Sequence, residues 1–355
     1  MIIRGKFQNI YGIKDLEIDF KQKYSNDKIQ EDQIIKADNV NVSLTPTILA
    51  KNAKCKTSLI KAIDFALRFS NRETFVRHVS NLKCQILIKE IFSKGEDTDE
   101  ISTIISNTKS NIFKEIFDEI SFAGSSDLLI ELETINNSII KIEAGADYFT
   151  ICINDEKIDL ISFIDDISLN SDENTSRMNL KSSVIDQVKE KSKNIKFISD
   201  HRNYSSIFRD ARLLTEINEI NVKYKTKKYI NNIINKLGFE ALDILLRKLD
   251  NNISSISFDL ESKGFNIFIK NSDVPIAPRN LSFGTQKVLE ILNNSLYLFE
   301  NGGIVMIDEI ENGLHISLIK LIVSLFEDPE INKASAQLLL TTHLPLLAEH
   351  NIINT

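Results

Sequence analysis

The chain has 355 residues, of which 42% are hydrophobic and 26% are charged, and its formal net charge at pH 7 is −7. These proportions are those of a folded globular protein and exclude a disordered or fibrous chain. The acidic balance gives no support to a surface that holds nucleic acid by general phosphate attraction, although a local basic patch is compatible with it. Three scattered cysteines are too few for a disulfide framework or a four-ligand zinc site.

The first residues lack the basic start and the apolar stretch of a signal peptide, and no apolar run approaches the ~20 residues that cross a bilayer. We therefore expect a soluble, cytoplasmic protein with no membrane partner.

The first part of the chain predicts a hairpin and then a strand, a loop and a helix. Apolar and polar residues alternate in segments 2–7 and 16–20, which predicts two strands. The polar segment 21–41 predicts an exposed loop. Segment 46–49 predicts a buried strand, and apolar residues at helical spacing predict a helix over 57–69.

The middle of the chain predicts an antiparallel lobe and then a short helical insert. Apolar runs at 85–88, 128–132 and 149–153 are typical of strands. The polar segment 170–174 and the charged segment 189–193 predict a loop or hinge. Helical spacing dominates residues 205–250, without the sustained heptads of a long coiled-coil arm.

The last part of the chain returns to alternating helices and strands. Helices are predicted at 285–299 and 316–326, and strands at 304–307 and 337–340. Strands as apolar as these belong to a parallel sheet that is covered on both faces. We expect three segments, 1–170 with an antiparallel β subdomain, 171–279 as the helical insert, and 280–355.

The strongest motif is an apolar strand, Ile304-Val305-Met306-Ile307, that ends in Asp308 and Glu309. At the carboxyl end of a parallel strand, Asp308 can reach Mg²⁺ and Glu309 can polarise an attacking water. This is the Walker B pattern, and the alternative is a strand that simply ends in acidic loop residues.

His343 follows the next predicted strand, where its ring can bond a γ-phosphate, although a single histidine there is also compatible with an ordinary loop residue. Ser282 and Gly284 lead into the helix before the acidic strand. A helix start offers N–H groups to an anion, whereas the simpler interpretation is that Ser282 only caps the helix.

The loop after segment 46–49 has the position, the lysine and the hydroxyl of a phosphate-binding loop. A standard loop has the pattern G-x-x-x-x-G-K-[ST], and here Ala50 and Cys55 stand at its glycine positions. Side chains therefore occupy places where backbone amides should approach phosphate. The candidate nucleotide-binding residues are Asn52, Ala53, Lys54, Cys55, Lys56, Thr57 and Ser58.

In chain order, the phosphate loop, the Ser282 segment, the Asp308–Glu309 pair and His343 together resemble the ABC-type ATPase heads of SMC, RecF and OLD proteins. They also resemble the related AAA-type ATPases of bacterial anti-phage systems. Segment 3–10 is similar to the first strand of that group, and segment 282–286 to its signature motif. The resemblance implies an α/β P-loop NTPase fold with a mainly parallel core sheet, an antiparallel β lobe and a short helical insert. Arg202, in segment 197–203, and Gln85 are weaker candidates by the same resemblance.

The resemblance also implies the cofactors ATP and Mg²⁺ and a role for each residue. Lys56 would hold the β- and γ-phosphates, Thr57 and Asp308 would serve Mg²⁺, Glu309 would activate water and His343 would sense the γ-phosphate. Ser282 and Gly284 would act across a homodimer, or a higher oligomer, in which two heads enclose two ATP molecules.

Three functions remain open at this point. The first is an ATPase that dimerises around ATP in an anti-phage or DNA-processing complex. The second is a nucleotide-regulated scaffold with weak or no hydrolysis that gates a separate effector nuclease or toxin. The third is a RecF-like DNA repair factor, for which the acidic charge offers no support.

Overall fold

The computed structural model describes residues 1–21, 34–37, 40–49, 55–93, 117, 120–135, 137–145, 147–167, 177–198, 204–207, 218–259, 264–348, 352 and 353. The chain forms two compact units that interleave along the sequence. Unit 1 comprises Met1 and residues 22–54 and 203–355, and unit 2 comprises residues 2–21 and 55–202. The division into three consecutive segments, 1–170, 171–279 and 280–355, stays a prediction.

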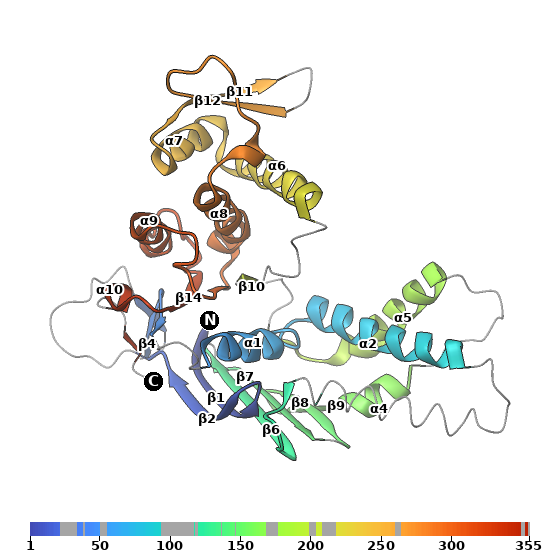
Figure 1. Cartoon of the computed structure of the whole chain (residues 1–355). Helices are drawn as coiled ribbons and strands as arrows, with labels where there is room; N and C mark the ends of the chain where they lie inside the picture. The colour runs from blue at the N-terminus through green and yellow to red at the C-terminus, as the bar shows by residue number, and fades with distance from the viewer. Residues whose placement is uncertain are drawn as a thin grey trace. The chain divides into compact units, whose positions relative to one another are not determined.

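Unit 2 is built on a six-stranded antiparallel sheet in the order β2-β1-β6-β7-β8-β9 (Figure 1). Buried and exposed side chains alternate along β6 and β7, as expected when one face of a sheet covers the core. The predicted N-terminal hairpin and the two strands predicted at 128–132 and 149–153 are confirmed. The strands are β1 (Ile2–Ile10), β2 (Ile13–Asp19), β6 (Asp127–Thr134), β7 (Ile139–Gly145), β8 (Phe149–Ile153) and β9 (Glu156–Asp159).

Helices cover this sheet. The predicted helix over 57–69 is α1 (Lys56–Leu67), which packs against β1, β6 and β7 through buried residues such as Ile60 and Ile63. Helix α2 lies beside α5, and Figure 1 shows the two together. The remaining bounds are α2 (Arg72–Ser93), α4 (Leu160–Asp165), α5 (Arg177–Lys191) and the 3₁₀ turn η2 (Ser192–Asn194).

Two predictions for this unit are wrong. The strand predicted at 85–88 lies within α2, because the buried residues Phe75, Val79, Leu82 and Ile86 recur at helical spacing over a longer window than the short apolar run. The charged segment 189–193 is helical rather than a loop. Lys189 and Lys193 pair with acids one turn earlier, Lys193 with Glu190 at 2.5 Å, and lysines suit a helix C-terminus. Segment 170–174 lies outside the described residues.

Unit 1 contains a five-stranded sheet in the order β10-β13-β14-β5-β15, and every neighbouring pair in it is parallel. All residues of β13 and β14 are buried, which is typical of parallel strands covered on both faces. The strands predicted at 46–49, 304–307 and 337–340 are confirmed. The strands are β5 (Thr47–Leu49), β10 (Tyr204–Ile207), β13 (Ile304–Ile307), β14 (Gln337–Thr342) and β15 (Ile352–Ile353).

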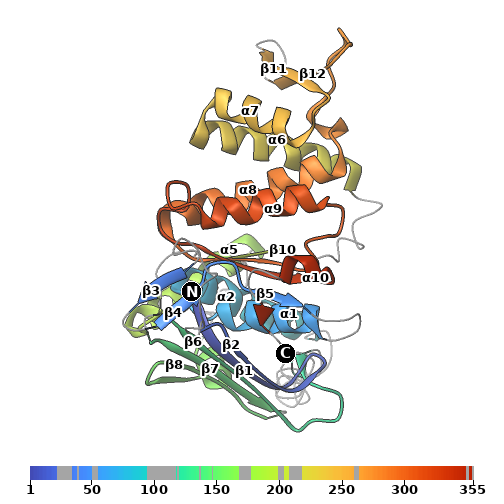
Figure 2. The same ribbon diagram turned by 90° about the vertical axis from the view of Figure 1, so that its left-hand side faces the viewer.

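Two long helices pack on this sheet, α8 against β10 and β13 and α9 against β14 (Figure 2). Helix α6 lies along α8 and joins it in one apolar core with α7, β11 and β12. The bounds are α6 (Asn218–Leu237), α7 (Phe239–Leu249), β11 (Ile253–Asp259), β12 (Gly264–Ile269), the 3₁₀ turn η4 (Pro278–Asn280), α8 (Phe283–Asn301), α9 (Ile316–Glu327) and α10 (Pro345–Ala348).

Three short strands of unit 1 depart from the prediction. The polar segment 21–41 was expected to be a loop, yet β3 (Ile34–Ala37) and β4 (Val40–Ser43) form an antiparallel pair. Strand β10 lies where helix was expected, because four residues are too few to show a period and its pairing with β13 decides its conformation.

Candidate active site

Asp308, Glu309 and His343 lie at a single edge of the parallel sheet of unit 1. The register pairs the last residue of β13 with Leu340 of β14, and Leu340 with Thr47 of β5. Because the strands are parallel, their carboxyl ends share that edge. Asp308 and Glu309 follow β13 directly, and His343 follows β14. The chain also enters the predicted phosphate loop from this edge, since that loop follows β5.

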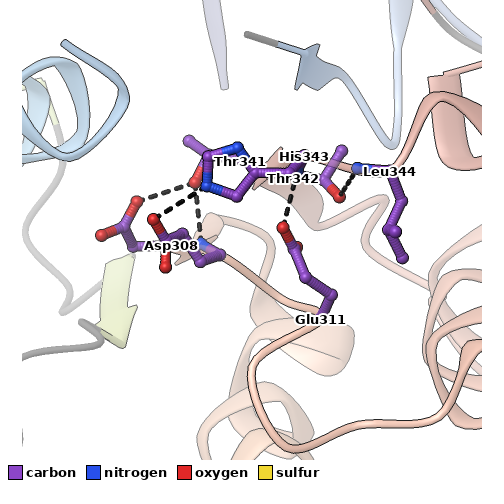
Figure 3. A network of polar contacts seen from close by, with 7 residues as sticks. Asp308, Glu311, Thr341, Thr342, His343 and Leu344 are labelled. Atoms are coloured by element: carbon purple, nitrogen blue, oxygen red, sulfur yellow. Dashed lines mark hydrogen bonds and ion pairs between the residues drawn. The ribbon is translucent and has the colours of Figure 1, made fainter. Parts of the chain in front are cut away.

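Thr341 of β14 connects the two acidic residues. Its hydroxyl donates a hydrogen bond of 2.7 Å to Oδ1 of Asp308 and accepts one of 2.8 Å from the backbone N–H of Glu309. Figure 3 shows Thr341 and Asp308 facing each other across the strand ends. Both side chains are buried, with 0% and 2% exposed. This contact fixes the Asp308 carboxylate and the start of the following turn.

Glu309 has a left-handed backbone, with φ 47°. This conformation costs a residue with a Cβ atom ~1–2 kcal/mol, and such strain concentrates at functional positions. Its Oε1 lies 3.1 Å from Nε2 of His343, with 14% of the Glu309 side chain and 27% of the His343 side chain exposed. A neutral imidazole with its proton on Nε2, or an imidazolium, donates this hydrogen bond. The backbone thus turns the second carboxylate toward the histidine.

Glu311 holds the other side of His343, and sequence reasoning did not identify it. Its Oε1 accepts a hydrogen bond of 2.6 Å from the backbone N–H of His343, as Figure 3 shows. Its Oε2 is buried and has no hydrogen-bond partner among the described residues. A buried carboxylate oxygen without a donor is costly, which is typical of a position that serves a site rather than stability. Its place two residues after Glu309 is the one signal that the sequence offers.

The start of α8 carries Ser282 and Gly284. The hydroxyl of Ser282 accepts a hydrogen bond of 3.1 Å from the N–H of Thr285, so the capping role that the sequence left open is present. Ser282 and Phe283 are exposed, and 65% of Phe283 is accessible. A Cβ atom on Gly284 would lie 3.1 Å from the carbonyl of Gly313, so glycine permits close contact with the turn after β13.

The described part of the phosphate loop begins at Cys55, and the predicted residues Asn52, Ala53 and Lys54 lie outside the described residues. Cys55 has φ 50°, a left-handed conformation that favours glycine. Its Sγ donates a hydrogen bond of 3.1 Å to the carbonyl of Gly12, in the β1–β2 turn. The backbone at this position is therefore one that glycine adopts without steric cost, although a side chain is present.

Helix α1 starts immediately afterwards, with Lys56, Thr57 and Ser58 in its first turn. Lys56 is 5% exposed, and Thr57 and Ser58 are half-buried. These three residues belong to unit 2, whereas Asp308, Glu309 and His343 belong to unit 1. Of the weaker candidates, Gln85 is exposed on α2, and Arg202 lies outside the described residues.

No group of three or more His, Cys, Asp and Glu side chains suited to a metal ion occurs in the part of the chain that the structure describes. Mg²⁺ at nucleotide sites needs one or two carboxylates together with substrate phosphates, so the oxygen of Asp308 fits that ion. Within the described ranges, each helix is too short or too polar to cross a bilayer.

Comparison with known proteins identifies the group to which the chain is related. Residues 51–349 match the family model described as "AAA domain, putative AbiEii toxin, Type IV TA system". Over 106 residues the chain is 31% identical to an ATP/GTP phosphatase of Helicobacter pylori (strain ATCC 700392 / 26695). That alignment covers 29% of this chain and 28% of the relative's length. The family match includes the candidate nucleotide-binding residues 52–58, the acidic pair and His343, and the chain therefore belongs to this family of AAA-type ATPase domains.

Proposed function

We propose that the chain binds and hydrolyses ATP as an ABC-type head, similar to those of SMC, RecF and OLD proteins. The observation that carries this proposal is the arrangement of Asp308, Glu309 and His343 at one carboxyl edge of the parallel sheet. Ligands of open α/β sheets bind outside the carboxyl ends of the strands. Membership of an AAA family supports nucleotide binding on independent grounds.

Each residue of the edge has a chemical task in this proposal. Asp308 would provide an oxygen ligand of Mg²⁺, which would neutralise charge on the phosphates. Glu309 accepts a hydrogen bond from the attacking water and orients it toward the γ-phosphate. His343 holds the Glu309 carboxylate at 3.1 Å and would sense the γ-phosphate. By the resemblance, Lys56 and Thr57 at the start of α1 are the residues assigned to the phosphates and to Mg²⁺.

The same proposal makes the site part of a homodimer. The first turn of α8 has N–H groups that no residue within the helix can satisfy, and they favour an anion. Ser282 and Phe283 at this helix start are exposed. Ser282 and Gly284 of one copy would cap the ATP of the second copy, so one chain alone would not complete the site.

Sedimentation velocity of Glu309→Gln with and without Mg-ATP tests this arrangement, since a slow variant accumulates the ATP-bound state. ATP should convert a monomer into a dimer, and Ser282→Arg should prevent it by placing bulk and charge at the cap. Ser324→Arg, on the exposed face of α9, is the matched control and should still dimerise. A sedimentation coefficient that ATP leaves unchanged, at concentrations where ATP is bound, would refute dimerisation.

Cys55 favours a second candidate, a nucleotide-regulated scaffold with weak or no hydrolysis that gates a separate effector nuclease or toxin. Its thiol-bearing side chain stands where a phosphate loop has glycine. The family description, with its putative toxin and type IV toxin–antitoxin system, is compatible with such an assembly in anti-phage defence. A pull-down with wild type and Glu309→Gln distinguishes the two candidates. A scaffold should capture equal amounts of its partner in both, whereas an enzyme that must turn over ATP should capture different amounts.

A further inference from the structure

Lys287 joins the start of α8 to the turn that follows Glu309. It lies on α8, one turn after Gly284, and its Nζ donates a hydrogen bond of 2.7 Å to the backbone carbonyl of Asn312. The turn itself is closed by a 2.9 Å hydrogen bond from the N–H of Asn312 to the carbonyl of Glu309. One lysine therefore spans from the helix to the residue that closes the strained turn.

The backbone of the same turn fits tightly against α8. Gly313 has φ 79°, and a Cβ atom there would overlap the ring of Phe283. A Cβ atom on Gly284 would lie 3.1 Å from the carbonyl oxygen of Gly313. Because neither glycine leaves spare room, a shift of the first turn of α8 displaces residues 309–313 rather than opening a gap.

The charge of Lys287 faces the acidic edge. Burial lowers the pKa of Lys287, while the carboxylates of Glu290, Glu311, Asp308 and Glu309 act in the opposite direction. These four carboxylates lie on α8 itself and in the segment after β13, and their charges act on the half-buried ammonium. An ammonium in this position is held between the helix and the site.

We propose that Lys287 is a positioning residue that ties the first turn of α8 to the 309–313 turn, so that a ligand seated at Ser282 sets the orientation of Glu309. This inference rests on the proposed function, because it assigns regulation to the same site. A ligand at Ser282 would thereby control the orientation of Glu309 in the same copy, and with it the rate of hydrolysis. The connection consists of one hydrogen bond and two glycine contacts.

Lys287→Met keeps the aliphatic bulk and removes the donor to Asn312. The expected result is a kcat at least about tenfold lower, with KM for ATP within about threefold of wild type, since small misplacements of a reacting group cost rate rather than binding. Lys287→Arg retains a donor at the same reach and should recover most of the rate. Loss of packing alone would lower kcat equally in both variants.

Lys236→Met is the matched control, because Lys236 pairs with Glu300 near the other end of α8 at 2.7 Å. It should leave kcat unchanged. Hydrogen–deuterium exchange supplies a readout that does not depend on turnover, and amides of residues 309–314 should exchange faster in Lys287→Met than in Lys236→Met. Unchanged exchange together with unchanged kcat in Lys287→Met would overturn the inference and leave the proposed function intact. A wild-type chain without ATPase activity would instead refute the proposed function, while the exchange data would still decide whether Lys287 holds the turn.

Discussion

The imidazole Nε2 of His343 lies 3.1 Å from Oε1 of Glu309, although the two residues follow different strands of the parallel sheet. Two further hydrogen bonds hold the backbone of this pair. The Thr341 hydroxyl accepts one from the N–H of Glu309, and the Glu311 carboxylate accepts one from the N–H of His343. A carboxylate and an imidazole held this way can share a proton or a water. The pair therefore couples the residue expected to orient water to the one expected to detect the γ-phosphate.

Thr341→Val tests the contact that orders the acidic pair. The valine removes the hydrogen bonds that the Thr341 hydroxyl makes to the N–H of Glu309 and to the carboxylate of Asp308, which should lower the unfolding free energy by ~1–3 kcal/mol. ATP turnover should fall as well. Thr341→Ser retains the hydroxyl and should stay close to wild type in both respects. Urea unfolding and phosphate release measure the two effects, and equal behaviour of Val and Ser would show that the hydroxyl does not order this site.

Cys55→Gly tests whether the phosphate loop tolerates its missing glycine. Glycine adopts φ 50° without steric cost, which relieves ~1 kcal/mol of strain and offsets the loss of the hydrogen bond to Gly12. Stability should therefore stay within about 1 kcal/mol of wild type, and ATP should bind more tightly.

Cys55→Ala is the control, because it removes the thiol but keeps the Cβ atom. It should bind ATP no better than wild type and be the less stable of the two variants in thermal unfolding. Equal ATP affinity in Gly and Ala would mean that the side chain at Cys55 does not restrict the nucleotide.

His78 gives unit 2 a defined sensitivity to acid. Burial, and then the positive charges of Arg68 and Arg77, lower its pKa from 6.5 to about 4, and its ring packs edge-on against Phe65 and Phe69. A folded-state pKa below the unfolded one gives stability that is complete above pH 6.5 and is lost as pH falls toward 4. At pH 5 the loss is at most about 2 kcal/mol.

His78→Phe should remove this part of the pH dependence, because phenylalanine has no proton to gain and suits the aromatic surroundings. Urea unfolding at pH 7 and pH 5 measures the difference for both proteins. A wild-type transition that weakens between these pH values no more than that of His78→Phe would contradict the assignment.

Much of the fold was predictable where an apolar pattern is long, or where a short apolar run leads directly into a recognisable motif. The predicted strand at 304–307 is β13, and the helix predicted at 285–299 is α8 with two residues added at each end. The mixed α/β class and the AAA-type ATPase family follow from these elements and the motifs on them. Short segments failed, because the apolar run 85–88 and the four residues of β10 show no reliable period and their partners decide their conformation.

The site residues that belong to a sequence motif were predictable. Those whose role depends on three-dimensional contacts were not. Asp308, Glu309 and His343 stand at strand ends that the pattern locates. Glu311 and Lys287 act through contacts with backbone groups of other segments, which no spacing in the sequence specifies. The same applies to the left-handed backbone of Glu309, which arises from the turn.

Phosphate release from Mg-ATP by the wild-type protein and by Glu309→Gln tests the central claim most directly. We predict ATP-dependent turnover in the wild type and a rate at least about a hundredfold lower in Glu309→Gln, as expected for loss of a general base, with ATP still bound. Wild-type phosphate release no faster than that of Glu309→Gln, in the presence of Mg²⁺ and both with and without DNA, would contradict it.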